Sequence, residues 1–321
     1  MKILLTGGAG FIGSNLAEVL VKDERVSGLV VLDNLETGNW NNIAHLEPNP
    51  KFEFVEGDIR DYKTCLDICS RVDLISHQAA LGSVPRSVAD PLTTNEVNIT
   101  GTLNIFNAAK ESGIKRIVYA ASSSTYGDHP GLPKVEDRIG TPLSPYGVTK
   151  LVNELYAKVF SNLYGLELIG LRYFNVYGPR QNPRGPYAAV IPLFIKSFLD
   201  DQPPLINGTG EHSRDFTFVQ DVVQANLLAL FTHKPEAVNQ VYNIARGERT
   251  SLNDLVKVLQ EITGKSVSAT YGPERKADVL HSHADISKAK NLLGYSPATS
   301  IRDGLLHTYG WYTENNLIFA Q

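Results

Sequence analysis

Three glycines close to the N-terminus constrain the fold of this chain more than any other feature. Gly7, Gly10 and Gly13 lie in the stretch LLTGGAGFIG, between a short apolar run over residues 3–6 and a helical pattern over residues 11–21. Glycines at this spacing let the turn close, let the backbone approach a pyrophosphate group and let the helix pack tightly on the strand. The helix N-terminus adds N–H donors and positive potential. The stretch therefore predicts a strand–turn–helix unit that binds a dinucleotide.

An acidic residue at the end of the next predicted strand supports this interpretation. Asp33 lies 20 residues after Gly13, where a carboxylate can accept hydrogen bonds from both ribose hydroxyls. It would repel a 2′-phosphate, and no arginine follows it immediately, so the sequence favours NAD over NADP. Asp58, after the third predicted strand, has two interpretations that the sequence leaves open. It contacts the adenine amine, or it is the N-cap of a helix predicted from Arg60.

Short β-branched runs alternate with helical patterns through the first half of the chain. This alternation predicts a doubly wound parallel (Rossmann) sheet with helices on both faces, followed by a smaller C-terminal α/β substrate lobe. We place the NAD-binding domain at residues 1–172 and the second lobe at 173–321, with a segment near 241–245 returning to the first sheet. Residues 34–50 are polar and turn-rich and predict no regular element. Predicted strands cover 3–6, 29–33, 52–55, 74–76, 117–120 and 168–171, and predicted helices cover 11–21, 60–70, 95–111, 145–164, 189–199, 219–231, 253–263 and 285–293.

The composition restricts the partners and the compartment. Hydrophobic residues make up 42% and charged residues 20%, with 30 Lys+Arg against 34 Asp+Glu, an ordinary soluble balance at net charge −4. This charge does not attract polyanions, so we expect neither nucleic acid nor membrane as a partner. Cys65 and Cys69 predict buried thiols in a reducing compartment, without partners at metal-ligand spacing. The apolar start breaks at Thr6, too early for a signal peptide. We therefore expect a cytoplasmic protein without a metal.

A tyrosine and a lysine four residues apart are the strongest candidates for proton transfer. Tyr146 and Lys150 fall at the start of the helix predicted over 145–164, and so lie on one helix face. An ammonium group near a phenol favours the phenolate and lowers the tyrosine pKa, as a general base requires. This spacing also occurs by chance, and its weight comes from its place after the fifth strand. Ser122, Ser123 and Ser124 end that strand, where hydroxyls either face a ligand or cap backbone groups.

These motifs together resemble a known enzyme family. TGGAGFIG, the Tyr146/Lys150 pair, LRYFNVYGPR and RDFTFV are similar to motifs of the extended short-chain dehydrogenases/reductases that act on nucleotide sugars, over nearly the whole chain. Residues 77–87 (HQAALGSVPRS) and 122–131 resemble UDP-sugar 4-epimerases, in particular the branch that prefers N-acetylated UDP-hexoses. The resemblance implies a UDP-N-acetylglucosamine 4-epimerase with tightly bound NAD. Such an enzyme oxidises the sugar at C4, lets the 4-keto sugar rotate and reduces it again, and it acts more weakly on UDP-glucose and UDP-galactose.

The resemblance also implies roles for individual residues. Ser122, Tyr146 and Lys150 are implied to be catalytic. The related 4,6-dehydratases carry an Asp-Glu pair at the positions of Ser123 and Ser124, so this chain cannot remove water in the same way. Implied cofactor contacts are Gly7, Gly10, Phe11, Ile12, Gly13, Asp33, Asn34, Gly38, Asp58, Ile59, Gln78, Ala79, Ala80, Asn98, Tyr146, Lys150 and Tyr173. Implied substrate contacts are Gly82, Ser83, Ser122, Ser123, Ser124, Tyr146, Asn175, Val190, Asn207, Arg214, Arg275, Asp278 and Ser282.

Arginines are expected to hold the diphosphate, because a guanidinium group binds phosphate with two hydrogen bonds. Arg214 and Arg275 match the family's diphosphate contacts, and surface salt bridges are the alternative for both. Arg86 and Arg180 are weaker candidates for the same task.

One small residue bears on substrate choice. The resemblance places Ser282 where epimerases restricted to UDP-galactose carry a tyrosine against the sugar C2 substituent, so the serine leaves room for an acetamido group. The flanking His281 and His283, and His77 at a strand end, are interpreted as local hydrogen-bonding residues. The family further implies a homodimer through the helices over 95–111 and 145–164.

Several other functions remain as alternatives. A UDP-glucose 4-epimerase is the simplest of them. A UDP-N-acetylhexosaminuronate 4-epimerase would need a cationic partner for the C6 carboxylate, which the sequence does not identify. A 4,6-dehydratase is disfavoured by Ser123 and Ser124. A non-catalytic NAD-binding protein would not need to retain Ser122, Tyr146 and Lys150 together.

Overall fold

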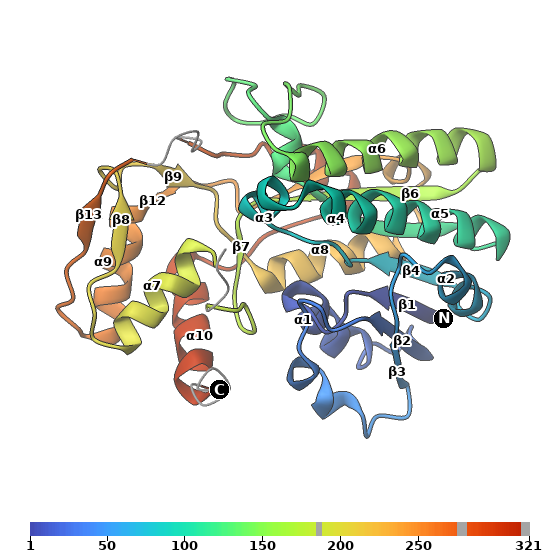
Figure 1. Ribbon diagram of the computed structural model, residues 1–321, viewed down its shortest axis with the longest axis horizontal. Coiled ribbons are helices and arrows are strands. Elements are labelled where there is room, and N and C mark those ends of the chain that lie inside the picture. Colours follow the sequence, from blue (N-terminus) through green and yellow to red (C-terminus); the bar gives the residue numbers. More distant parts are fainter. Residues whose placement is uncertain (184–187, 275–280, 316–321) are drawn as a thin grey trace.

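The computed structural model describes residues 1–183, 188–274 and 281–315, which form two lobes (Figure 1). Within these residues, the larger lobe contains a seven-stranded sheet in the order β11-β6-β5-β4-β1-β2-β3, and all neighbouring strands are parallel. This arrangement confirms the predicted doubly wound α/β fold. The strands are β1 (Lys2–Thr6), β2 (Gly28–Asp33), β3 (Phe52–Glu56), β4 (Leu74–His77), β5 (Arg116–Ser122), β6 (Glu167–Tyr173) and β11 (Val241–Ile244).

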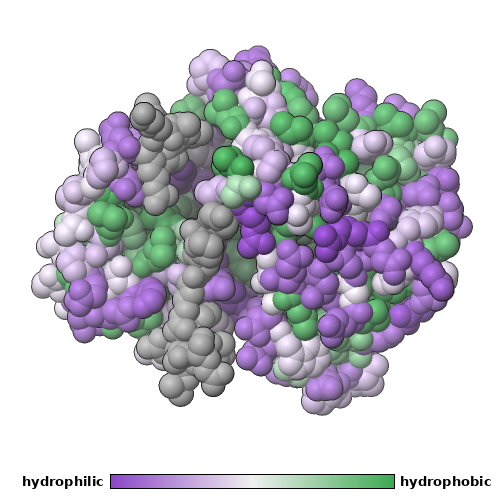
Figure 2. Space-filling model, viewed as in Figure 1, coloured by the Kyte–Doolittle hydropathy of each residue, from purple (hydrophilic) through white to green (hydrophobic). Residues whose placement is uncertain are grey.

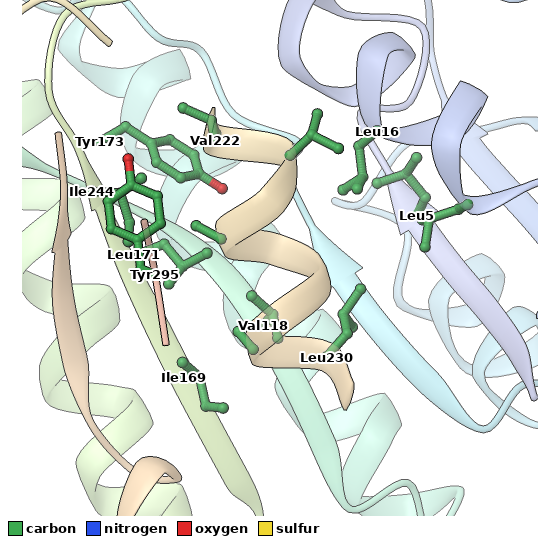
Figure 3. Close-up of a cluster of buried hydrophobic side chains, with 14 of the residues drawn as sticks. Leu5, Leu16, Val118, Ile169, Leu171, Tyr173, Val222, Leu230, Ile244 and Tyr295 are labelled. Atoms are coloured by element: carbon green, nitrogen blue, oxygen red, sulfur yellow. The ribbon is translucent and has the colours of Figure 1, made fainter. Parts of the chain in front are cut away.

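Successive residues of the central strands contribute to two separate cores. Leu5 and Val118 pack with α1 (Phe11–Leu20) and α8 (Val219–Phe231) on one face of the sheet, as Figure 3 shows. Leu4 and Ile117 belong to the other core, with α2 (Tyr62–Cys69), α5 (Thr102–Glu111) and α6 (Pro145–Tyr164). Because both faces of the sheet are buried, the strands need continuous apolar runs. That requirement is what makes them recognisable in the sequence.

Short helices occupy the connections near the carboxyl edge of the sheet. After β4 the chain forms α3 (Val84–Ala89), α4 (Pro91–Asn95) and the π-helical turn η3 (Glu96–Gly101) before α5, so the helix predicted over 95–111 begins earlier and is interrupted. Two 3₁₀ helices, η1 (Trp40–Asn42) and η2 (Ala44–Leu46), lie where no regular element was expected. Two further 3₁₀ helices are η4 (Ser123–Tyr126) and η5 (Pro235–Ala237).

The smaller lobe is built from helices and very short strands. Its core is formed by α7 (Val190–Leu199), α9 (Leu252–Thr263) and α10 (Ile301–Glu314), whose apolar residues include Phe198, Leu255 and Leu305. The helix predicted over 285–293 is helical only over 287–293, mostly as the π turn η6 (Ala289–Leu293), and α10 was not predicted. The strand pairs are β8 (Leu205–Asn207) with β13 (Thr270–Gly272), β9 (Ser213–Arg214) with β12 (Thr250–Ser251), and β7 (Val176–Tyr177) with β10 (Thr217–Phe218).

The two lobes are interleaved in sequence. β7 and β10 lie between the lobes, and α8 and β11 then return to the larger lobe (Figure 1). The carboxylate of Asp215 fixes this return, since it accepts hydrogen bonds from the backbone N–H groups of Arg246 (2.9 Å), Gly247 (3.2 Å) and Ala284 (3.1 Å). Burial raises the pKa of Asp215 to about 6 despite these donors. None of the helices within the described residues is both long and apolar enough to cross a membrane.

Candidate active site

A cleft of about 780 Å³ follows the carboxyl ends of the parallel strands. Its lining includes Gly7 after β1, Asp33 at the end of β2, Gln78 after β4, Ser122 at the end of β5 and Tyr173 at the end of β6. Figure 2 shows the molecule hollowed between its two lobes on this side. Ligands of doubly wound sheets bind at this edge, where the loops leave the sheet on opposite sides.

The glycine-rich turn after β1 is closely packed. Gly7 has a φ of +69°, and a Cβ atom there would lie 2.6 Å from the backbone nitrogen of Ala79. A Cβ atom on Gly13 would lie 2.0 Å from the carbonyl oxygen of Gly7. Gly10, the N-cap of α1, provides no side chain to cap the helix. The first-turn N–H groups of α1 therefore remain available at the cleft, and the turn fits the pyrophosphate of a dinucleotide.

Carboxylates gather at the β2–β3 end of the cleft. Asp33 accepts hydrogen bonds from the N–H groups of Ala9 and Leu35, both at 2.9 Å, and burial raises the pKa of its carboxyl group. Glu36 and Asp58 also line this end. Three acidic side chains beside a ribose would repel a 2′-phosphate, which favours NAD.

Asp58 is bound by its own neighbours. Arg60 donates to it from the backbone (2.8 Å) and from the guanidinium (2.6 Å), and Asn34 donates at 2.8 Å. The hydrogen bond with the Arg60 guanidinium is the main reason that the pKa of Asp58 falls to about 2. The N-cap alternative for Asp58 is wrong, because α2 begins at Tyr62 and its cap is Asp61, which accepts from the N–H of Lys63.

Three side chains near the middle of the cleft form a hydrogen-bonded group. The Tyr173 hydroxyl donates to the Gln78 amide oxygen (3.0 Å) and accepts from the Asn226 amide (2.9 Å), which ties β6, β4 and α8 together. Asn98 does not line the cleft. It is buried beneath Leu81, to whose backbone N–H and carbonyl its amide is bonded, and it also donates to Thr149.

Ser122, Tyr146 and Lys150 meet at the β5 end of the cleft. Ser144 is the N-cap of α6 and accepts from the N–H of Gly147 (3.1 Å), which places Tyr146 in the first helical turn and Lys150 one turn later. The Ser122 hydroxyl is close enough to Tyr146 to lower the pKa of that phenol in part. The Lys150 ammonium donates to the Ala120 carbonyl (2.8 Å) and lies 5.9 Å from the centroid of the Tyr146 ring.

The expectation that Lys150 lowers the pKa of Tyr146 is wrong for this arrangement. Burial raises the pKa of Tyr146 above its ordinary value, and the hydrogen bond with Ser122 only partly opposes this. The Lys150 ammonium is bonded to the carbonyl of Ala120. Burial lowers the pKa of Lys150 to about 8, so the group stays mostly charged at neutral pH.

The other hydroxyl residues after β5 have different surroundings, since some line the cleft and some bond to the backbone. Ser123 lines the cleft, whereas Ser124 does not. The N–H of Ser124 donates to the Ser122 hydroxyl (3.1 Å), and the Thr125 hydroxyl donates to the Ser122 carbonyl (2.8 Å). Thr125 therefore ends the strand as a backbone cap.

The residues predicted in the smaller lobe are less closely gathered. Asn175, at the lobe junction, lines the cleft and donates to the carbonyl of Asp215 (3.2 Å). Arg214 and Ser282 are neighbours, because the N–H of Ser282 donates to the carbonyl of Ser213 (3.0 Å). Val190, at the start of α7, and Asn207, at the end of β8, lie elsewhere in this lobe; neither they nor Arg214 and Ser282 are among the described residues that line the cleft. Arg275 and Asp278 fall outside the described residues.

The remaining candidates have clear structural partners. Arg180 pairs with Glu18 and does not line the cleft. His77 lies between the hydroxyls of Thr6 (2.7 Å) and Thr102 (3.0 Å), and burial lowers its pKa to about 3. His281 and His283 bond to the Ser213 hydroxyl and the Gly247 carbonyl. Within the described residues, no group of His, Cys, Asp and Glu side chains could hold a metal ion.

Some residues that line the cleft were not predicted from the sequence. Most of them are next to predicted residues in the loops after the strands, and that position could have indicated them. Gln181, Asn182 and Ala188 come from the connection between the lobes, where no motif pointed to a contact. The lining residues not predicted as contacts are Leu32, Glu36, Thr37, Asn39, Gly57, Leu81, Val97, Ala120, Ala121, Val176, Gln181, Asn182 and Ala188.

Comparison with known proteins identifies the family to which this chain belongs. The sequence model of the NAD dependent epimerase/dehydratase family matches residues 3–245. A UDP-glucose 4-epimerase of Mycolicibacterium smegmatis is 36% identical over 314 residues, with 97% of this chain and 98% of the relative covered. The solved UDP-glucose 4-epimerase of Thermotoga maritima, with UDP-glucose, is 38% identical with a TM-score of 0.91, covering 98% of this chain and 100% of its own.

A second solved structure is similar to the same extent. The UDP-N-acetylglucosamine 4-epimerase of Methanobrevibacter ruminantium M1, in complex with UDP-N-acetylmuramic acid, is 36% identical with a TM-score of 0.92, and 98% of each chain is covered. These matches confirm the family and the cofactor that the sequence predicts. The chain belongs to the NAD dependent epimerase/dehydratase family and is an NAD-dependent enzyme.

Proposed function

We propose that this enzyme interconverts UDP-N-acetylglucosamine and UDP-N-acetylgalactosamine by reversible oxidation at C4, with weaker activity on UDP-glucose and UDP-galactose. The observation that carries the proposal is that Ser122, Tyr146 and Lys150 line the same end of the cleft, with the Lys150 ammonium 5.9 Å from the centroid of the Tyr146 ring. Ser123 stands where the related dehydratases carry an acid, and the carboxylates among the described lining residues lie at the opposite, β2–β3 end of the cleft. The UDP-sugar 4-epimerases among the relatives support the same reaction.

The chain's own residues can manage the proton of the sugar O4. When bound, NAD supplies the hydride acceptor and donor that oxidation and re-reduction of a sugar carbon require. Tyr146 takes the O4 proton and returns it, and the Ser122 hydroxyl, which lines the same end of the cleft, hydrogen-bonds to O4 and shares that proton. Lys150, one turn further along α6, donates to the Ala120 carbonyl of β5 and so holds the start of the helix, with Tyr146, against that strand.

The two lobes divide the ligands between them. We assign NAD to residues 1–172 and the UDP-sugar to 173–321 together with Gly82, Ser83 and the strand-end serines. In this assignment Arg214 holds the diphosphate, with Arg275, and Asp278 contacts the uridine ribose. A loosely held hexose beside a firmly held diphosphate can present either face to the cofactor.

One assay tests the proposed reaction directly. Purified protein is incubated without added NAD, first with UDP-N-acetylglucosamine and then with UDP-glucose, and the products are separated by chromatography. We expect the C4 epimer of each sugar, formed faster from the acetylated one. A keto-deoxy product would show dehydration, and the absence of any product with NAD added would contradict the proposed function.

Replacing Ser282 with tyrosine tests the basis of substrate choice. Ser282→Tyr should lower kcat/KM for UDP-N-acetylglucosamine by about 10- to 100-fold, because overpacking costs about 1–3 kcal/mol. Turnover of UDP-glucose should change little. Ser282→Ala, which keeps the site small, is the control and should retain both activities. An equal loss on both sugars in Ser282→Tyr would show that the size of this residue does not determine substrate choice.

We also propose that the enzyme is a homodimer through α6 and the helix predicted over 95–111, which in the structure continues from α4 through η3 and α5. Leu155, Val159 and Leu163 recur on one face of α6 and are 57%, 48% and 68% exposed, and Leu92 on α4 is 76% exposed. A helix with an apolar outer face is usually covered by another element. Sedimentation equilibrium should therefore give twice the chain mass of 35.2 kDa, and a monomer at micromolar concentration would contradict the proposal.

A further inference from the structure

One guanidinium group that lines the cleft has no hydrogen-bond or ion-pair partner among the described residues. Arg86, on α3, lines the cleft and is half-buried, and its guanidinium makes no hydrogen bond or ion pair with the described residues. Other arginines in and around the cleft are paired: Arg60 with Asp58, and Arg180 with Glu18. A half-buried guanidinium has five donors to satisfy and gains most from a planar anion.

The acidic and the basic side chains that line the cleft lie on different sides of it. Asp33, Glu36 and Asp58 lie after β2 and β3, whereas Lys150 and Arg86 come from the side of β4 and β5. Within the described lining, no carboxylate lies on that second side. Lys150 is already bonded to the Ala120 carbonyl. Arg86 is therefore the cation without a partner among the described residues on the side of Ser122, Tyr146 and Lys150, which we call the reacting end.

Arg86 also lies on the elements that face the reacting end. It follows Gly82 and Ser83 by one helical turn, and its backbone N–H donates to the Ser83 hydroxyl (3.2 Å). α3 packs against α6, whose first turn carries Tyr146. The glycine turn that fits the cofactor's pyrophosphate follows β1, and Arg214, assigned to the substrate diphosphate, lies in the smaller lobe. Neither diphosphate requires Arg86.

We propose that Arg86 binds an acidic substituent on the hexose ring, so that the enzyme accepts UDP-sugars bearing a carboxylate as well as neutral ones. This inference rests on the proposed function, since it concerns the sugar held beside Tyr146. A guanidinium and a carboxylate match in two parallel hydrogen bonds, and a neutral hydroxymethyl group cannot replace that match. Arg86 is then a specificity-determining residue and takes no part in the proton transfer.

The test compares two UDP-sugars that differ only at C6, UDP-glucuronate and UDP-glucose. Arg86→Gln should lower kcat/KM for UDP-glucuronate by about 10- to 100-fold, mainly through KM, because a hydrogen bond to a charged group is lost. The value for UDP-glucose should change by less than about threefold. Arg86→Lys, which keeps the charge without the planar fork, should lie between the two. Arg302→Gln, at an exposed position on α10 outside the cleft, is the control and should leave both sugars unaffected.

Two results would overturn the inference. Equal losses on both sugars would assign Arg86 to a group that they share, such as a diphosphate. A wild-type enzyme that epimerises UDP-glucose but neither binds nor converts UDP-glucuronate would exclude a site for the carboxylate. If no UDP-sugar is epimerised, the proposed function fails, and competition binding of the two sugars to wild type and Arg86→Gln still decides the role of Arg86.

Discussion

Tyr146→Phe should lower kcat for C4 epimerisation by about 100- to 10,000-fold, the range that a positioned acid–base group contributes. The change removes one oxygen atom, the Tyr146 hydroxyl at the β5 end of the cleft. The half-buried ring keeps its contacts, so the fold should be retained. NAD should remain bound, because the glycine turn and Asp33 are untouched.

Steady-state rates, the NAD released on denaturation and the melting temperature should be measured on the same preparation. Tyr156→Phe is the matched control, because Tyr156 lies on the same helix, packs against the adjacent core and does not line the cleft. It should keep the wild-type rate. An undiminished rate in Tyr146→Phe would show that another group moves the O4 proton, and the proposed mechanism would be wrong.

Gly13→Ala should abolish retention of NAD and destabilise the larger lobe. A methyl group at this position would lie 2.0 Å from the carbonyl oxygen of Gly7 and 2.8 Å from the Cα atom of Gly8. Both are backbone atoms, so the turn must open to make room. Overpacking of this kind costs about 1–3 kcal/mol, and more where backbone must move. An opened turn also displaces the N–H groups that suit a pyrophosphate.

The measurement is the NAD content of the purified protein together with its melting temperature, with and without added NAD. Gly310→Ala provides the control, since a Cβ atom on Gly310 meets no atom within 4 Å. Within the helix α10, alanine should be more favourable than glycine by about 0.5–1 kcal/mol, so the melting temperature should rise slightly. Full NAD content in Gly13→Ala would contradict the role given to the glycine turn.

The larger lobe could be predicted from the sequence because its elements carry their own periodicity. β1, β2 and β5 are continuous apolar runs that end at Thr6, Asp33 and Ser122, and parallel topology brings such ends to one edge. The smaller lobe offered no such signal. β7, β9, β10 and β12 are two residues long, which is shorter than the repeat by which a strand is recognised. They form because tertiary contacts position them.

The same distinction applies to the candidate site. The cleft residues from strand ends were predicted, since strand ends are local features of the sequence. The pKa of Tyr146 was predicted in the wrong direction, because its spacing to Lys150 is visible in the sequence whereas burial depends on the whole fold. Asn98 was predicted at the cofactor, but its amide is bonded to the backbone of Leu81, 17 positions away. Arg86 was a candidate from a motif, and the structure shows that its guanidinium has no hydrogen-bond or ion-pair partner among the residues it describes.

The return of α8 and β11 to the larger lobe limits how such enzymes can be recombined. β11 pairs with β6 at the edge of the sheet, and α8 covers the face that carries Leu5 and Val118. A chimera with one crossover near residue 173 would give the sheet a foreign edge strand and a foreign helix. Exchange of substrate lobes between relatives therefore needs extra junctions on either side of residues 219–245. It should also keep Asp215 with its partners Arg246, Gly247 and Ala284 from one parent.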